Sequence, residues 1–198
     1  MNNQNSTPKI ILASSSPFRK ALLQRLQLNF DALSPEVDET AILGESPEAL
    51  VARLALLKAS EVAKDHPNAL IIGSDQVAII DGQILGKPGN HARATAQLQA
   101  ASGKRVSFLT SLCLLDNRDG QHQLEVVPYG VVFRTLNDTM IEAYLQREQP
   151  YQCAGSFKSE GLGITLFEKL DGEDPTALIG LPLIRLTHML ENTGITVL

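Results

Sequence analysis

A hydroxyl-rich turn followed by two cations is the first part of the sequence that could bind an anion. Three serines (residues 14–16) and a proline lead into Arg19 and Lys20, which fall in the first turn of a predicted helix. Free N–H groups at a helix N-terminus bind anions, and serine hydroxyls add donors. Cations are disfavoured at this end, because the helix dipole is positive there. A bound anion would resolve the conflict; the alternative is that both cations are solvated surface residues.

Carboxylates at two places in the sequence could activate water or hold a metal. Asp75 interrupts the apolar run ALIIGSDQVAII, where a strand has no structural need for an acid. A carboxylate at the end of a buried strand often lies at the cleft where open α/β sheets bind ligands. Asp38 and Glu39 lie in the polar segment SPEVDETAILGE, for which the alternative is an ordinary solvated loop. Asp75 is therefore the better catalytic candidate.

Two lysines could reach a phosphate. Lys58 lies on a predicted helix, where the alternative is a surface lysine whose aliphatic stem packs against the helix. Lys87 lies in the tight Gly-Lys-Pro turn of GQILGKP. This segment is not a P-loop, because it is one residue short between its glycines and Pro88 replaces the hydroxyl residue needed for magnesium. Lys87 could nevertheless contact a phosphate from such a turn.

Cations and carboxylates gathered at loops near strand ends suit a polyphosphate ester bound with a divalent metal. The metal and the cations would offset phosphate charge, and a carboxylate would activate water. Hard oxygen ligands favour Mg²⁺ or Mn²⁺. The four histidines are scattered, and the sequence has no Cys/His cluster of the kind that binds zinc.

The elements that must position these residues alternate between strands and helices. The run 69–80 is strand-like but broken at Gly73-Ser74-Asp75, and Asp81-Gly82 predicts a hairpin. No linker separates two independent halves, so we expect a single domain over residues 1–198 with an α/β fold, a mixed twisted sheet flanked by helices. Periodicity and capping residues predict further strands at 9–13, 104–115, 121–134 and 164–169, and helices at 17–26, 46–64, 90–102, 137–148 and from Pro182.

Composition narrows the class of protein. The chain has 198 residues, of which 43% are hydrophobic and 20% charged, as is ordinary for a globular protein. A net charge of −5 argues against a general nucleic-acid or anionic-membrane surface. Cys113 and Cys153 cannot form a disulfide framework and are expected to be reduced thiols. The polar N-terminus lacks the pattern of a signal peptide, and we expect a cytoplasmic protein without a membrane span.

Several segments resemble the Maf family of nucleoside triphosphate pyrophosphatases. They are LASSSPFRKALL, EVDET, LLKA, IIGSDQVAIIDGQILGKP and CAGSFKSEGLGITLFEKLDGEDPTALIGLPL, and together they extend from about residue 9 to 190. The resemblance implies two lobes with a central nucleotide cleft, in a fold related to that of the inosine triphosphate pyrophosphatases. It also implies metal-dependent cleavage between the α and β phosphates, which gives a nucleoside monophosphate and pyrophosphate.

The resemblance further implies which residues form the site. Ser14 and Arg19 fall in the phosphate-binding turn, and Glu39, in the acidic loop, would help to hold the metal. The catalytic residues that it implies are the proton acceptor Asp75 and the lysines Lys58 and Lys87.

Three positions depart from the commonest Maf pattern, which is typical of members that act on dTTP and UTP. At these positions the sequence instead resembles the 7-methyl-GTP pyrophosphatase branch of the family. Phe18 replaces an arginine, Gln76 a threonine, and Glu160 a glutamine. An aromatic face and a carboxylate both favour N7-methylguanine, because this base is positively charged. A carboxylate can also accept hydrogen bonds from the N1–H and N2–H edge of guanine. The alternative for Phe18 is a place in the apolar core.

The expected reaction is hydrolysis of 7-methyl-GTP to 7-methyl-GMP and pyrophosphate. A metal ion and three cations (Arg19, Lys58 and Lys87) would bind this modified nucleoside triphosphate, and Asp75 would deprotonate the attacking water. The alternatives are a dTTP/UTP or broad-specificity nucleotide pyrophosphatase, and a non-catalytic nucleotide-binding regulator of septum formation. A pure binder has no use for a water-activating base, which favours the enzyme. A homodimer is compatible with either class.

Overall fold

A computed structural model describes residues 8–198 of the chain. The prediction that the extreme N-terminus carries no signal peptide falls almost entirely on residues 1–7, outside this range. Within the described range, none of the helices combines the length and the apolar character that a bilayer crossing requires.

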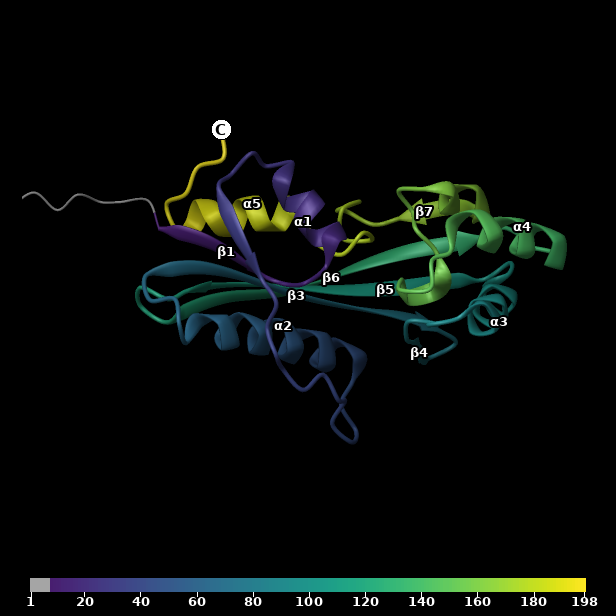
Figure 1. The fold of residues 1–198 in the computed structure, drawn as a ribbon, viewed down its shortest axis with the longest axis horizontal. Coiled ribbons are helices and arrows are strands. Elements are labelled where there is room, and N and C mark those ends of the chain that lie inside the picture. Colours follow the sequence, from purple (N-terminus) through teal and green to yellow (C-terminus); the bar gives the residue numbers. More distant parts are fainter. Residues whose placement is uncertain (1–7) are drawn as a thin grey trace, which may run out of the picture.

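In the described part of the chain, a seven-stranded mixed sheet runs through the molecule (Figure 1). Its strand order is β2-β1-β3-β5-β6-β7, and β4 pairs with β3 outside this sequence. β1 is parallel to both β2 and β3, whereas the other pairs are antiparallel. The predicted α/β fold with a mixed sheet flanked by helices is therefore confirmed. The strands are β1 (Lys9–Ala13), β2 (Phe30–Leu33), β3 (Ala69–Ile80), β4 (Gln83–Leu85), β5 (Arg105–Asp116), β6 (Gln121–Phe133) and β7 (Phe167–Asp171).

Helices cover both faces of the sheet. Near one end, α1 and α5 lie on one face and α2 lies on the other, while α3 and α4 lie near the opposite end (Figure 1). Four of the helices predicted from capping residues begin with a side-chain cap: Ser16, Ser46, Asn90 and Asn137 each accept a hydrogen bond from the backbone N–H three residues later. The α-helices are α1 (Pro17–Gln24), α2 (Pro47–Ala63), α3 (His91–Ala101), α4 (Asp138–Glu148) and α5 (Leu183–Asn192).

Three strands differ from the sequence-based expectation. The run 69–80 is one uninterrupted strand, although the segment Gly73-Ser74-Asp75 predicted a break, because β5 pairs along nearly its whole length. The short strand β2 was not predicted, since it has only four residues, none of them fully buried, and a single polar residue among them. β7 begins at Phe167 rather than at residue 164, because residues 162–166 form a 3₁₀-helix.

The apolar core is divided among several clusters along the long strands. On one face, Leu22 of α1 and Leu186 of α5 pack against β1 and β3. On the opposite face, Ala55 and Ala59 of α2 pack against the same strands. Toward the other end of the sheet, α3 and α4 pack with Phe108 and its neighbours. The long strands β3 and β5 contribute to all of these clusters and so connect the two groups of helices.

α2 crosses β3 at Gly73, closer than a side chain would allow. A Cβ atom at Gly73 would lie 2.1 Å from the backbone oxygen of Ala55 and 3.1 Å from the Cβ of Ala59. Lys58 follows Ala55 by three residues, so it lies on nearly the same face of the helix. The close approach at Gly73 therefore brings Lys58 to β3 beside Asp75.

We expect Gly73→Ala to lower the free energy of unfolding by about 1–3 kcal/mol, because the added methyl group forces α2 away from β3. Gly86→Ala is the matched control, since a Cβ atom at Gly86 meets nothing within 4 Å. Urea unfolding followed by circular dichroism measures both variants. Equal stability of the two variants would contradict the close approach of α2.

Candidate active site

One edge of β3 is open between the ends of two neighbouring strands. β1 pairs with β3 as far as Gly73, and β4 pairs with it only from Ala78 onward. Both strands lie on the same side of β3, because β5 occupies the other side. None of the described strands therefore pairs with residues 74–77 on this side. A cavity of about 560 Å³ lies at this opening, and Asp75, Gln76 and Val77 line it.

The cavity brings together every residue that the resemblance to the Maf family placed in the site. Their roles stay predictions, but their proximity is a property of the fold. Lys20, by contrast, is exposed and lies outside the lining, so only one of the two cations in the first turn of α1 reaches the cavity. The predicted residues that line it are Ser14, Phe18, Arg19, Glu39, Lys58, Asp75, Gln76, Lys87 and Glu160.

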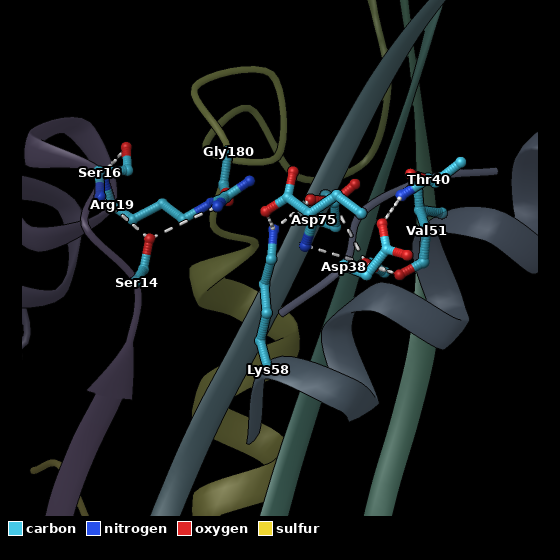
Figure 2. Close-up of polar contacts among 11 residues, drawn as sticks. Ser14, Ser16, Arg19, Asp38, Thr40, Val51, Lys58, Asp75 and Gly180 are labelled. Atoms are coloured by element: carbon cyan, nitrogen blue, oxygen red, sulfur yellow. Dashed lines mark hydrogen bonds and ion pairs between the residues drawn. The ribbon is translucent and has the colours of Figure 1, made fainter. Parts of the chain in front are cut away.

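Lys58 lies between two carboxylates of the cavity. Its Nζ is 2.6 Å from Asp75 Oδ1 and 2.7 Å from Glu39 Oε1. The side chains of Lys58 and Asp75 are only 8% and 11% exposed, whereas that of Glu39 is 59% exposed. Figure 2 shows Lys58 extending from α2 to Asp75 on β3. Lys58 is thus not a surface lysine, and its buried ammonium is paired as buried charges must be.

Ser111 fixes the backbone at Asp75. The backbone N–H of Asp75 donates to Ser111 Oγ at 3.0 Å, and this hydroxyl donates to the carbonyl of Val51 at 2.6 Å. Ser111 is fully buried. One hydroxyl on β5 therefore ties β3 to α2 at the position of the Lys58–Asp75 pair. The sequence analysis missed Ser111, although a serine within the apolar run of β5 was a signal that could have pointed to it.

Arg19 reaches the cavity from the first turn of α1. Its Nε donates to the carbonyl of Gly180 at 2.8 Å, and its Nη1 approaches Ser14 Oγ at 3.5 Å (Figure 2). Burial lowers the pKa of the guanidinium, an effect that the nearby carboxylates of Asp75 and Glu39 oppose. Arginine nevertheless stays charged at any ordinary pH. Arg19 is therefore a fixed cation at one wall of the cavity.

The acidic loop that carries Glu39 is held by an arginine of α2. Arg53 donates two hydrogen bonds to Glu45, at 2.6 and 2.8 Å, and a third to the carbonyl of Thr40 at 3.1 Å. The pairing with Arg53 lowers the pKa of Glu45 to about 2. Asp38 accepts from the backbone N–H of Thr40 at 2.9 Å and is not part of the cavity lining. Of the two acids in this loop, Glu39 is thus the one at the site.

The residues expected to recognise the base surround the same cavity. Phe18 is partly exposed and belongs to none of the apolar clusters found within residues 8–198, so the core alternative for it is wrong. Gln76 donates from Nε2 to Thr110 Oγ1 at 2.8 Å and to backbone carbonyls of the loop before α5. Glu160 is exposed at the rim, where Ser159 Oγ donates to it at 3.3 Å.

Glu148 of α4 holds the loop that carries Glu160. One of its oxygens accepts from the backbone N–H of Leu162 at 2.8 Å, and the other lies 3.2 Å from Lys158 Nζ. These two bonds, the one from Leu162 first, lower the pKa of the Glu148 carboxyl. A Cβ atom at Gly161 would lie 2.8 Å from this carboxylate, so a larger residue there would displace the end of the Glu148 side chain.

Two further residues of this region line the cavity and were missed from the sequence. Lys158 adds a cation to the lining, to which the exposed Lys87 also belongs. Cys153 also lines the cavity; burial raises the pKa of its thiol to about 11, so the thiol stays protonated at neutral pH and is not a nucleophile. Both cysteines are free, as predicted. The loop with Lys87 is anchored by Gly89, whose N–H donates to the carbonyl of Tyr151 at 2.9 Å.

The donor chemistry of the cavity fits a hard divalent cation that substrate phosphates help to bind. Glu39 and Asp75 both direct carboxylate oxygens at Lys58 Nζ, so their charges converge on one point. Mg²⁺ is usually held by one or two carboxylates together with phosphate oxygens. Within residues 8–198 no group of three or more His, Cys, Asp and Glu side chains is arranged to hold a metal without such help.

Cations, two converging carboxylates and an open strand edge define an α/β protein with a charged cleft. Comparison with known families identifies it further. The model of the family described as "Maf-like protein" matches residues 9–193, so the chain belongs to the Maf family. The family expected from the sequence is confirmed.

Named relatives match over nearly the full chain. A Nitrosococcus oceani protein named "7-methyl-GTP pyrophosphatase" is 58% identical over 191 residues, which are 96% of each chain. Proteins with the same name from Alcanivorax borkumensis (58% identity, 96% and 97% of the two chains) and Nitrosospira multiformis (53%, 100% of both) are similarly close. Among solved structures, the Staphylococcus aureus Ham1 protein is a weak and partial match, with a TM-score of 0.46 and 15% identity over 63% of this chain and 71% of its own.

Proposed function

We propose that this protein hydrolyses 7-methyl-GTP to 7-methyl-GMP and pyrophosphate. The observation that carries the proposal is the single cavity that contains both the Lys58–Asp75 pair and the three residues expected to select the base. The relatives at 51–58% identity that bear the name "7-methyl-GTP pyrophosphatase" support the same substrate. The buried Lys58–Asp75 pair favours an enzyme over a regulator that only binds nucleotides, since binding needs no water-activating carboxylate.

The cations of the cavity bind the triphosphate. The Nε of Arg19 is engaged by Gly180, which leaves its terminal nitrogens for phosphate oxygens. Lys58 and Lys87 bring two more positive charges to the lining. Fixed cations at this position stabilise the charge that grows on the leaving pyrophosphate. A divalent cation held by Glu39 with the substrate phosphates would offset phosphate charge in the same way.

Asp75 takes the proton from the attacking water. Lys58 engages its Oδ1, and no described residue donates to its Oδ2, which leaves this oxygen for the water. The water oxygen forms a bond to the α-phosphorus while the bond from that phosphorus to the bridging oxygen breaks. The pyrophosphate keeps the bridging oxygen, and the water proton passes to Asp75. Lys58 and Ser111 hold the carboxylate in place for this step.

We expect turnover to require a divalent cation. EDTA lowers turnover, and Mg²⁺ or Mn²⁺ restores it, because the carboxylate oxygens of Glu39 and the phosphate oxygens of the substrate suit these ions. Ion-exchange chromatography of the reaction identifies the products. Full activity in EDTA would contradict the metal requirement, whereas orthophosphate as the first product would contradict cleavage between the α and β phosphates.

A further inference from the structure

The loop between β7 and α5 touches the site through backbone carbonyls. We refer to residues 174–182 as the carbonyl loop. Its Gly180 carbonyl accepts from Arg19 Nε at 2.8 Å and from Ser74 Oγ at 2.9 Å. Its Ala177 carbonyl accepts from Thr110 Oγ1 at 2.8 Å. The loop therefore bonds to side chains of α1, β3 and β5, all of which border the cavity.

The carbonyl loop also sets the direction of the Gln76 amide. Gln76 Nε2 donates to the carbonyls of Ala177 and Leu178 at 2.9 and 3.1 Å. Only the NH₂ end of an amide can face carbonyl oxygens. Gln76 lines the cavity, and its Oε1 is turned away from these carbonyls, so it offers an acceptor to a ligand. The N1–H and N2–H groups of guanine are donors that such an acceptor can bind.

Asp174 holds the carbonyl loop in shape although it does not itself line the cavity. It is 1% exposed, and its Oδ1 accepts from the backbone N–H of Thr176 at 3.0 Å and from Thr176 Oγ1 at 2.6 Å. Its Oδ2 accepts from the backbone N–H of Ile184 at 2.8 Å, and Thr176 Oγ1 accepts from that of Leu183 at 2.8 Å. Pro182 at the N-cap of α5 makes no side-chain cap bond. Asp174 and Thr176 therefore cap α5 from within the loop.

We propose that Asp174 is a positioning residue for substrate selection. Together with Thr176 it fixes the carbonyl loop on the N-terminus of α5, and the loop in turn orients Gln76 toward the base and Arg19 toward the phosphates. The inference rests on the proposed function for the identity of the base. Two effects are expected. Loss of the Arg19 orientation lowers the rate of hydrolysis of all nucleotides alike, whereas loss of the Gln76 orientation changes the preference among nucleotides.

The test compares kcat/KM for 7-methyl-GTP and UTP in three variants. Asp174→Asn and Thr176→Val each remove part of the cap, and Thr176→Ser keeps the hydroxyl. We expect the first two to lower the ratio of the two kcat/KM values about tenfold, because small misplacements of binding groups cost that much or more. Thr176→Ser is expected to keep the wild-type ratio. Thermal unfolding midpoints identify any variant that fails to fold. If Asp174→Asn fails to fold, the ratio measured for Thr176→Val, which lacks only one hydroxyl, decides the test.

The same substitutions in a Gln76→Ala background show whether the effect passes through Gln76. If it does, Asp174→Asn and Thr176→Val lower the ratio no further there, because coupled residues are not additive. An unchanged ratio in the single variants, or an equal additional fall in the Gln76→Ala background, would overturn the positioning role. A wild-type protein that prefers UTP would instead contradict the proposed function, and the ratios in these variants would still decide the role of Asp174.

Discussion

Asp75→Asn is expected to lower turnover by about 10²–10⁴-fold while nucleotide binding persists, because loss of a positioned general base typically costs that much. The amide keeps the shape of the side chain but cannot accept the proton of the attacking water. Binding is expected to persist or to tighten, since a negative charge beside the phosphates is removed. Single-turnover kinetics gives the rate, and isothermal titration calorimetry gives the affinity.

Asp116→Asn is the matched control for Asp75→Asn. Asp116 is similarly buried and is also paired with a cation, Arg118, but it does not line the cavity. Asp116→Asn therefore reports the cost of weakening a partly buried ion pair outside the cavity. A wild-type rate in Asp75→Asn, or the same loss of rate in both variants, would contradict the role of Asp75 as the base.

Glu160→Gln is expected to lower kcat/KM for 7-methyl-GTP much more than for UTP. Hydrogen bonds from the guanine edge to an ionised carboxylate contribute about 1.5–3 kcal/mol. Stacking of the cationic base on Phe18 adds about 0.5–2 kcal/mol. Together these interactions favour 7-methyl-GTP by roughly two powers of ten, although such contributions are not strictly additive. Phe18→Arg should change the preference in the same direction.

The comparison of two nucleotides separates specificity from general damage. A folding defect lowers both kcat/KM values together, whereas loss of base recognition lowers one. Glu168→Gln provides a matched control, because Glu168 is an exposed glutamate on β7 that does not line the cavity. Equal losses on the two nucleotides in Glu160→Gln would contradict the assignment of Glu160 to the base.

Local signals in the sequence predicted most of the elements and the residues that line the cavity. The Ser16 cap and the cations after it placed a helix N-terminus at the cavity, and the acid within the apolar run of β3 identified Asp75. Pairing between strands was not predictable in this way. β3 is continuous where Gly73 suggested a break, and the opening beside Asp75 arises because β1 ends before β4 begins. The periodicity of one segment does not indicate where the strands that pair with it begin and end.

Backbone acceptors were the other part of the site that the sequence did not reveal. The carbonyls of Ala177 and Gly180 orient Gln76 and Arg19, and a carbonyl group belongs to every residue alike. Ser111 and Lys158 reach the site only through the packing of β5 and of the loop after α4. These contacts join segments distant in the sequence, so the fold determines them, although a serine within an apolar run can mark a candidate such as Ser111.

The most direct test of the central claim is kcat/KM of the wild-type protein for 7-methyl-GTP and for UTP in the presence of Mg²⁺, with the products identified by chromatography. The account predicts a preference for 7-methyl-GTP of about two powers of ten, from the contributions of Glu160 and Phe18, with 7-methyl-GMP and pyrophosphate as products. A preference for UTP, equal rates on the two nucleotides, or release of orthophosphate first would contradict it.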